Sequence, residues 1–245
     1  MDIKNKVVVI TGGGRGLGKE LAKTLAREGS RVIICSRNRT ELSKVCLEVS
    51  NKNGSCEYFV VDVSDKKQVN KFIDDVVTRY RKIDVLINNA GYVHEWETIE
   101  NTPEKEMERC FETNVYPIFY FLKKVIPLMK KQNEGTVINI SSMAGKRGVP
   151  NLAAYSASKF AVIGLTQAVA KEVNNTGIYC ITVCPGGMNT SMREKVLGSE
   201  DAKGQQDPKV VGDVIKSILI GKIKVPHGGD ISIRYGEISA IDKPK

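Results

Sequence analysis

Long apolar runs are absent from this sequence. No stretch of its 245 residues approaches the roughly 18–20 apolar residues that a helix needs to cross a bilayer. No apolar signal segment precedes the first strand-like run, which begins at Val7. We therefore expect a cytoplasmic protein with no membrane partner.

Metal-binding patterns are also scarce. The sequence has two histidines, His94 and His227, and its six cysteines form no CxxC pair. Zinc sites usually combine several such ligands at short spacings, so no metal is predicted. Several cysteines lie inside apolar runs, and we interpret all six as reduced thiols of the core.

Acidic residues are outnumbered, since 28 Asp and Glu stand against 37 Lys and Arg for a net charge of +9. The lysines are spread along predicted helices rather than gathered in a tail. This spread favours a solvated basic surface over a nucleic-acid patch, while attraction toward an anionic cofactor or substrate is a third interpretation. No nucleic-acid partner is predicted.

Apolar runs rich in β-branched residues alternate with amphipathic segments along the chain. The amphipathic segments Thr40–Ser50, Asp65–Tyr80 and Ala153–Val173 are predicted helices. The predicted strands are Val7–Thr11, Arg31–Ser36, Cys56–Val63, Val85–Ala90, Thr136–Ser142, Tyr179–Cys184 and Ile231–Tyr235. The alternation predicts an α/β fold: a Rossmann-type, doubly wound parallel sheet of seven strands with helices on both faces.

Two further segments are predicted from local signals. Asp65, with a glutamine three positions later, indicates a helix start, and Pro103 is expected at the first helical position of the next helix. That helical region spans residues 102–131 and is predicted to break near Asn114 or Pro117.

No repeat or linker divides the chain. Residues 1–245 are therefore predicted to form one dinucleotide-binding catalytic domain. The least regular segment, 189–207, is rich in Gly, Ser, Lys and Asp, and it is interpreted as a mobile substrate lid.

The first strand leads into a glycine-rich turn and then a helix. Glycines let the backbone approach a phosphate closely, and a helix start offers unpaired N–H groups. A tight turn with no ligand is the alternative for such a motif alone. The predicted cofactor contacts in this turn are Gly12, Arg15, Gly16, Leu17 and Gly18.

The second strand ends in Ser36 and Arg37, where a dinucleotide fold meets the adenosine ribose. An acidic residue there would repel a 2′-phosphate, whereas a hydroxyl and a guanidinium bind one. With Arg15 nearby, this favours NADP(H) over NAD(H). The alternative is that Arg37 and Arg39 are surface residues.

The next two strands also end in candidate contacts. Asp62 and Val63 follow the third strand, where a carboxylate can accept the adenine amine or cap the next helix. Asn89, Ala90 and Gly91 follow the fourth, where small residues suit a backbone passing close to a ligand. A turn held by asparagine side chains is the alternative.

Tyr155 and Lys159 are four positions apart and share one face of a predicted helix. A phenol titrates near pH ~10, and a nearby ammonium with an oxidised nicotinamide favours the phenolate. We therefore expect Lys159 to lower the pKa of Tyr155, which then exchanges a proton with a substrate oxygen. Ser142, at the end of the preceding strand, is placed to hydrogen-bond that oxygen.

In this order the motifs resemble the short-chain dehydrogenase/reductase family over residues 5–190. The TGxxxGxG turn begins at Thr11, the NNAG motif is Asn88–Gly91, and the YxxxK motif is Tyr155 and Lys159. The resemblance implies hydride transfer between NADP(H) and a carbonyl or secondary alcohol, with Tyr155 as general acid/base. It also implies that Lys159 binds the nicotinamide ribose.

Further residues are assigned by the resemblance. Ser142 lies thirteen residues before Tyr155, a spacing that the family often shows, which favours it over Ser141. Asn114 matches the family's catalytic asparagine, which holds a water in a proton relay with the lysine. The PGxxxT segment implies four contacts to the nicotinamide end: Pro185, Gly186, Met188 and Thr190.

Other functions stay open. The chain lacks the Asn-Gly-Gly ending of many 3-oxoacyl-[acyl-carrier-protein] reductases, yet that activity is an alternative. A non-catalytic NADP-binding regulator is another, because a fold does not fix a function. The resemblance also implies a homo-oligomer, a tetramer or dimer packed through residues 102–131 and 153–173.

Some basic and aromatic residues are candidates for the substrate side. His94 and Trp96 follow the NNAG motif and either border the substrate or lie in a surface loop. Lys146 and Arg147 follow Ser142 and either favour an anionic substrate or are ordinary exposed residues. The substrate itself is a small molecule whose identity the sequence leaves open.

Overall fold

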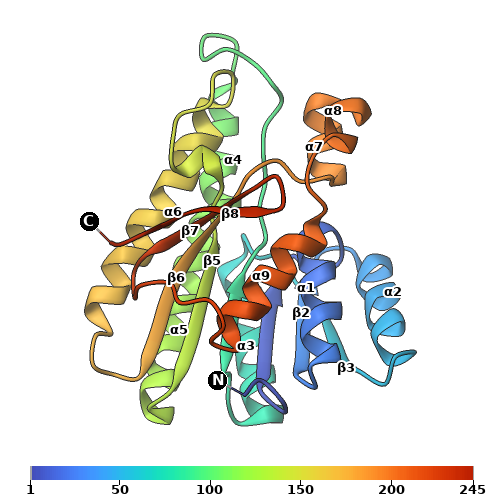
Figure 1. The fold of residues 1–245 in the computed structure, drawn as a ribbon, viewed down its shortest axis with the longest axis vertical. Coiled ribbons are helices and arrows are strands. Elements are labelled where there is room, and N and C mark those ends of the chain that lie inside the picture. Colours follow the sequence, from blue (N-terminus) through green and yellow to red (C-terminus); the bar gives the residue numbers. More distant parts are fainter. Residues whose placement is uncertain (1, 245) are drawn as a thin grey trace.

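The computed structural model describes residues 2–244, so the two ends of the predicted 1–245 domain lie outside it. One sheet has the order β3-β2-β1-β4-β5-β6-β7-β8 (Figure 1). Its strands are β1 (Val7–Thr11), β2 (Arg31–Ser36), β3 (Ser55–Val60), β4 (Val85–Asn88), β5 (Gly135–Ile140), β6 (Ile178–Pro185), β7 (Asp230–Arg234) and β8 (Glu237–Asp242).

The predicted α/β class and parallel sheet are confirmed, but the strand number is corrected. The pairs from β3 through β7 are all parallel, as predicted. An eighth strand, β8, pairs antiparallel with β7. Five of its six residues are exposed, and its sequence alternates polar and apolar residues instead of forming the continuous apolar run by which the other strands were recognised.

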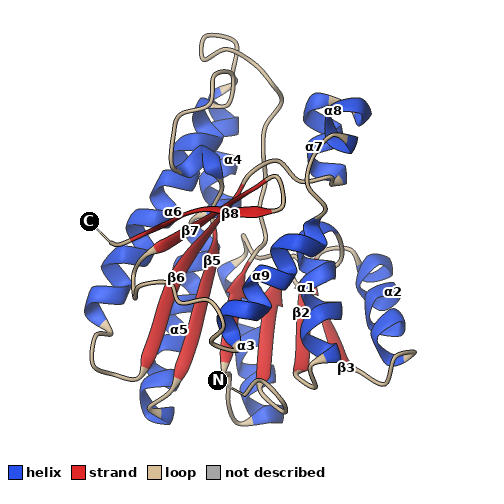
Figure 2. Cartoon of the chain, in the orientation of Figure 1, coloured by secondary structure: helices blue, strands red, loops and turns tan. Residues whose placement is uncertain are grey.

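Helices cover both faces of the sheet. They are α1 (Gly16–Arg27), α2 (Arg39–Ser50), α3 (Lys66–Tyr80), α4 (Glu104–Asn114), α5 (Tyr116–Gln132), α6 (Ala153–Glu172), α7 (Ser191–Leu197), α8 (Ser199–Lys203) and α9 (Pro208–Leu219), with a short 3-10 turn, η1 (Met143–Gly145). Helices α1, α2 and α9 lie on one face, and α3, α5 and α6 on the other (Figure 2).

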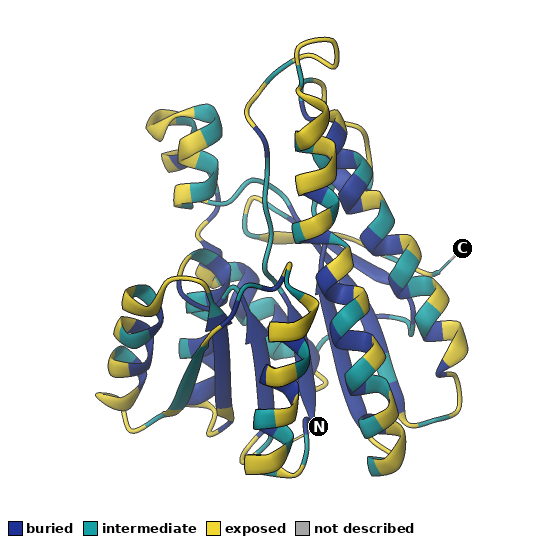
Figure 3. Ribbon diagram, turned by 180° about the vertical axis from the view of Figure 1, so that it is seen from behind, coloured by how far each residue is buried: buried dark blue, intermediate teal, exposed yellow. Residues whose placement is uncertain are grey.

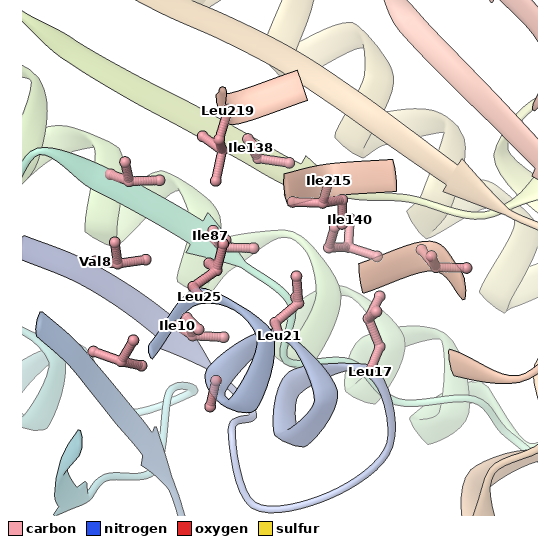
Figure 4. Close-up of a cluster of buried hydrophobic side chains, with 14 of the residues drawn as sticks. Val8, Ile10, Leu17, Leu21, Leu25, Ile87, Ile138, Ile140, Ile215 and Leu219 are labelled. Atoms are coloured by element: carbon pink, nitrogen blue, oxygen red, sulfur yellow. The ribbon is translucent and has the colours of Figure 1, made fainter. Parts of the chain in front are cut away.

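Two apolar cores follow from this layering. On one side, Leu21 of α1 and Ile215 of α9 pack against strand residues such as Ile10 and Ile87 (Figure 4). On the other, Phe72 and its neighbours on α3, α5 and α6 pack against the opposite strand faces. Figure 3 shows the buried strands between helices whose outer faces are exposed. Strands buried on both faces explain the continuous apolar runs in the sequence.

Local expectations are confirmed with one exception. Asp65 is the N-cap of α3, and its side chain accepts bonds from two backbone N–H groups of the first turn. The long helical region breaks at Val115, between α4 and α5. Pro103, however, is the N-cap of α4 rather than its first helical residue, because its ψ of 139° keeps it extended.

The segment 189–207 is more regular than predicted. It forms the two short helices α7 and α8, which project beyond the sheet (Figure 1). A bridge between Met188 and Gln206 joins the two ends of the segment. The two helices have only seven and five residues, and the many polar residues and glycines of the segment obscure their helical pattern in the sequence.

The cysteines are free thiols, as predicted, and all but the partly exposed Cys56 are buried. The sulfur atoms of Cys46 and Cys56 lie 2.6 Å apart. Within residues 2–244, no helix combines the length and the hydropathy that crossing a membrane requires.

The strand order fixes where a ligand site can form. Connections leave β1 toward β2 and leave β4 toward β5, in opposite directions across the sheet. In open α/β sheets the crevice at such a reversal, beyond the carboxyl ends of the strands, is the usual binding site.

Candidate active site

A cavity of about 380 Å³ lies at this reversal. It brings together most of the residues that the sequence predicted as cofactor contacts. Those in its wall are Gly12, Arg15, Gly16, Leu17, Ser36, Arg37, Asp62, Val63, Asn89, Ala90, Gly91, Tyr155, Lys159, Met188 and Thr190. Gly18 and Pro185 are not in the wall, and Gly186 lies in a second cavity described below.

The glycine turn fits a phosphate group. Gly12 has a φ of +67°, and a Cβ there would lie 2.9 Å from the Cα of Ala90. A Cβ on Gly18 would lie 2.2 Å from the carbonyl oxygen of Gly12, so this glycine lets α1 approach the turn. Arg15, the N-cap of α1, forms no side-chain cap, which leaves the first N–H groups of the helix free to bind an anion.

Asn89 both supports this turn and lines the cavity. Its side-chain amide donates to the carbonyl oxygen of Thr11 at 2.9 Å, and the hydroxyl oxygen of Thr11 accepts bonds from the backbone N–H groups of Asn89 and Ala90. The asparagine-held turn is therefore confirmed, and the ligand contact stays a prediction for residues that line the cavity.

One charged residue near the end of β2, Glu41, was not predicted from the sequence. Arg15, Ser36 and Arg37 line the cavity as predicted, but Glu41 lines it as well. Glu41 lies on the first turn of α2, three residues after the N-cap Asn38, whose side chain accepts its N–H. Asn38 is a typical N-cap residue, so the sequence could have predicted that Glu41 lies in the first turn of α2, at the end of the helix that borders the cavity.

Tyr155 and Lys159 lie on the same face of α6, as predicted. The Nζ of Lys159 is 5.7 Å from the centre of the Tyr155 ring and donates to the backbone oxygen of Ile140 at 3.0 Å. Lys159 is only 4% exposed and forms no ion pair with any residue from 2 to 244. A buried ammonium without a carboxylate is available to a ligand in the cavity.

Burial shifts the pKa values of both Tyr155 and Lys159. Burial raises the pKa of Tyr155 to about 12, although the neighbouring Ser142 hydroxyl opposes this. The lowering that the sequence predicts applies to Tyr155 beside a bound oxidised nicotinamide, and it stays a prediction. Burial also lowers the pKa of Lys159 to about 8, so the side chain is mostly charged at pH 7 but loses its proton at a lower pH than an exposed lysine does.

Ser142 and Ser141 have different surroundings. The Ser142 oxygen accepts the N–H of Ala144 at 3.1 Å, and the hydroxyl forms a hydrogen bond with the Tyr155 side chain. The Ser141 hydroxyl donates to the backbone oxygen of Lys159 at 2.8 Å, so its hydrogen is already used. The structure thus pairs the Ser142 hydroxyl with Tyr155 and the Ser141 hydroxyl with the backbone.

Asn114 is buried beside the site but lies in neither cavity wall. Its amide group donates to the backbone oxygen of Tyr92 and to the Ser158 hydroxyl, and its oxygen accepts the N–H of Tyr92. These bonds tie the end of α4 to the segment after β4 and to α6. The Asn114 amide oxygen and the Lys159 Nζ both lie near Gly91, at 3.4 and 3.6 Å from the position of an added Cβ.

A second cavity, of about 420 Å³, adjoins the first. Tyr155 and Ser142 lie in its wall, and Tyr155, Met188, Thr190 and Met192 belong to both walls. Residues of α7 also line it, so the predicted lid segment forms part of the wall.

Of the four residues that the sequence suggested for the substrate side, two line the second cavity and two do not. Trp96 lines the second cavity, whereas His94 is buried away from it. Arg147 also lines the cavity, but Lys146 does not, because it binds Asp230 and Asp242.

Known proteins share this architecture. The family model described as short chain dehydrogenase matches residues 6–201. Dehydrogenase/reductase SDR family member 6 of Rattus norvegicus is 38% identical over 203 residues, which cover 82% of this chain and 79% of the relative.

Two solved structures resemble the whole chain. NAD+-bound xylitol dehydrogenase has a TM-score of 0.85 at 30% identity, covering 96% of this chain and 99% of that one. A variant of actinorhodin polyketide ketoreductase with NADPH has a TM-score of 0.85 at 29% identity, covering 95% and 97%. The glycine turn, the nicotinamide-binding neighbours and the matched model lead to one assignment. The chain belongs to the short-chain dehydrogenase/reductase family of oxidoreductases.

Proposed function

We propose that this protein transfers a hydride between NADP(H) and a carbonyl or secondary alcohol, with Tyr155 exchanging the proton. The observation that supports this best is the position of Tyr155, which lies in the walls of both cavities. A substrate in the second cavity and a nicotinamide in the first would therefore meet at its hydroxyl. Holding two reactants in this way supplies much of the rate in such reactions.

Tyr155 is suited to donate a proton during carbonyl reduction. When bound, the reduced nicotinamide supplies the hydride. Because the pKa of Tyr155 is raised to about 12 without cofactor, the phenol is protonated at neutral pH. It gives this proton to the oxygen that gains negative charge, while the Ser142 hydroxyl donates a hydrogen bond to the same oxygen.

Lys159 and Asn114 are proposed to restore the proton and hold the geometry. Lys159 has a buried ammonium in the cofactor cavity, where it can bind the nicotinamide ribose and pass a proton toward Tyr155. Asn114 keeps the segment after β4 beside that ammonium through its three hydrogen bonds, and a water of the proposed relay would lie next to it.

NADP(H) is the proposed cofactor. The cavity wall carries three positive charges, Arg15, Arg37 and Lys159, and two negative charges, Glu41 and Asp62, which leaves an excess of one positive charge. Together with the Ser36 hydroxyl, this favours a 2′-phosphate. The segment α7–α8 is proposed as a lid, since it lines the substrate side and α7 has no buried residue.

The proposed function is tested by following NADPH oxidation over a varied panel of ketones, aldehydes and acyl-thioester ketones, and repeating the panel with NADH. We expect turnover with at least one carbonyl and a preference for NADPH. NADPH binding without turnover on any member would favour a non-catalytic regulator. Activity on acyl-thioester ketones alone would favour 3-oxoacyl-[acyl-carrier-protein] reduction.

A further inference from the structure

The second cavity has an unbalanced charge. Its wall is mostly apolar, with Trp96, Val149 and Leu152 among its residues, and it contains three arginines but no aspartate or glutamate. An apolar wall with a few convergent polar groups is the usual form of a small-molecule site. The arginines therefore decide which ligands this cavity can hold.

Two of the three arginines have no acidic partner. Arg193 forms an ion pair with Asp201, which balances its charge inside the lid segment. Arg147 and Arg234 form no ion pair with any residue between 2 and 244. The Arg234 guanidinium instead lies 5.3 Å from the centre of the Tyr235 ring, an arrangement that orients it without neutralising it.

Two elements that are far apart in the sequence supply these arginines to the same cavity. Arg147 follows η1, and Arg234 ends β7, so they are far apart in sequence. Lys146, next to Arg147, binds both carboxylate oxygens of Asp230 at 2.7 and 2.9 Å and one oxygen of Asp242 at 3.0 Å. This contact joins the start of β7 and the end of β8 to the turn after η1.

We propose that the second cavity takes a substrate with an apolar body and a carboxylate, which Arg147 and Arg234 bind while its carbonyl or alcohol carbon lies at Tyr155 and Ser142. This inference rests on the proposed function. An arginine fork binds a carboxylate through two parallel hydrogen bonds, so the pair would also fix the direction in which the substrate lies. Neutral ketones of the same shape would lack this anchor.

The first test compares oxo acids with their methyl esters. A series from 4-oxopentanoate to 10-oxoundecanoate carries a methyl ketone and a carboxylate at increasing separation, and each ester removes only the charge. We expect kcat/KM to favour one or more oxo acids over the matched esters by about 10- to 100-fold. Equal values along the whole series would overturn the inference while leaving the proposed function intact.

The second test removes the two charges. In Arg147→Gln/Arg234→Gln, the ratio of kcat/KM for oxo acid over ester is expected to fall by about 10- to 100-fold. Arg31→Gln, which removes an exposed arginine at the start of β2, is the matched control and should keep the ratio. A ratio that survives in the double variant would contradict the assignment.

A binding measurement separates this inference from catalysis. Titration of octanoate into the NADP+-loaded protein should give a Kd at least about tenfold lower than in the double variant, whether or not turnover occurs. Octanoate binding that ignores both arginines would overturn the inference. Tighter arginine-dependent binding of octyl phosphate than of octanoate would overturn the choice of a carboxylate.

Discussion

Lys159 holds a charge where few charges are stable. It is 4% exposed, and its Nζ donates to a backbone oxygen rather than to a carboxylate. Burial of an unpaired ammonium costs free energy, which is why its pKa falls to about 8. Such a cost at a ligand site is consistent with a residue kept for function rather than for stability.

This cost gives a stability prediction with a definite sign. Lys159 loses its proton near pH 8 when folded but near 10.5 when unfolded. Between these values the unfolded chain binds more protons, so the free energy of unfolding rises with pH and the penalty is complete only below about pH 8. Lys159→Met should therefore stabilise the protein at pH 7, on the order of 2–3 kcal/mol.

Denaturant unfolding at pH 7 and pH 10.5 measures this effect. We expect the advantage of Lys159→Met to shrink strongly at the higher pH, whereas exposed Lys130→Met should show no such trend. A variant that is equally or less stable than the parent at pH 7, with no dependence on pH, would contradict the description of Lys159.

Arg37 supports a second prediction at the residue scale. Arg37→Asp should raise the Kd of NADPH by about 10- to 100-fold, because it removes a charge-assisted bond and adds repulsion, and it should change the Kd of NADH far less. Glu41→Gln should act in the opposite direction on NADPH. Fluorescence titration measures both, with Arg39→Asp as the control, and equal effects on the two cofactors would mean that Arg37 does not contact a 2′-phosphate.

Single residues also show where sequence reasoning ends. The YxxxK spacing predicted that Tyr155 and Lys159 share a helix face, and the motif order named most of the residues that line the first cavity. It did not predict that burial dominates the pKa of Tyr155. The burial of Tyr155 depends on the elements that pack around α6, and the spacing between Tyr155 and Lys159 does not indicate which elements those are.

At the scale of elements, the β7–β8 hairpin shapes the substrate side. It contributes Arg234 and Tyr235 to the second cavity, and Lys146 holds it against η1 through Asp230 and Asp242. Asp230 is 2% exposed, and its side chain forms an ion pair with Lys146. The sequence did not predict β8, because an exposed edge strand carries no continuous apolar run.

Removal of Lys146 should therefore destabilise the hairpin. We expect Lys146→Met to lower the free energy of unfolding by about 1.5–3 kcal/mol, since Asp230 would be left buried and unpaired. Lys203→Met breaks an exposed pair with Glu200 and should cost at most about 0.5 kcal/mol. Urea unfolding compares them.

A second substitution checks the cause. Asp230→Asn removes the buried charge, so Lys146→Met/Asp230→Asn should recover part of the loss. Two results would show that the contact does not hold the hairpin. One is an equal loss in the free energy of unfolding for Lys146→Met and Lys203→Met. The other is a loss in the double variant that exceeds the sum of the losses in its two single variants.

At the scale of the whole molecule, the sequence predicted the cavity that consecutive strands form but not the cavity that distant segments form. The first cavity is built from the ends of consecutive strands, so the strand pattern and motifs such as Asn88–Gly91 were enough to locate it. The second cavity combines the loop at Trp96, the turn at Arg147, α7 and the β7–β8 hairpin. Their meeting depends on long-range packing such as the Lys146 contact, which no local pattern encodes.

The proposed homo-oligomer is a prediction at this scale. Phe119 on α5 and Phe160 on α6, the helices expected to form the interface, are 52% and 47% exposed. Light scattering should give a dimer or tetramer, and Phe119→Glu/Phe160→Glu should shift it toward the monomer without unfolding, because a charge at a buried interface is unfavourable. A monomeric parent protein would contradict the prediction.

The central claim is that the Tyr155 hydroxyl transfers the proton at the junction of the two cavities. The direct measurement is single-turnover oxidation of saturating NADPH on an accepted carbonyl by Tyr155→Phe, with Tyr116→Phe removing an equivalent hydroxyl from an exposed tyrosine. We predict that Tyr155→Phe folds, binds NADPH like the parent and loses roughly 10²- to 10⁴-fold in rate, while Tyr116→Phe does not. A Tyr155→Phe variant that keeps the rate of the parent would contradict the account.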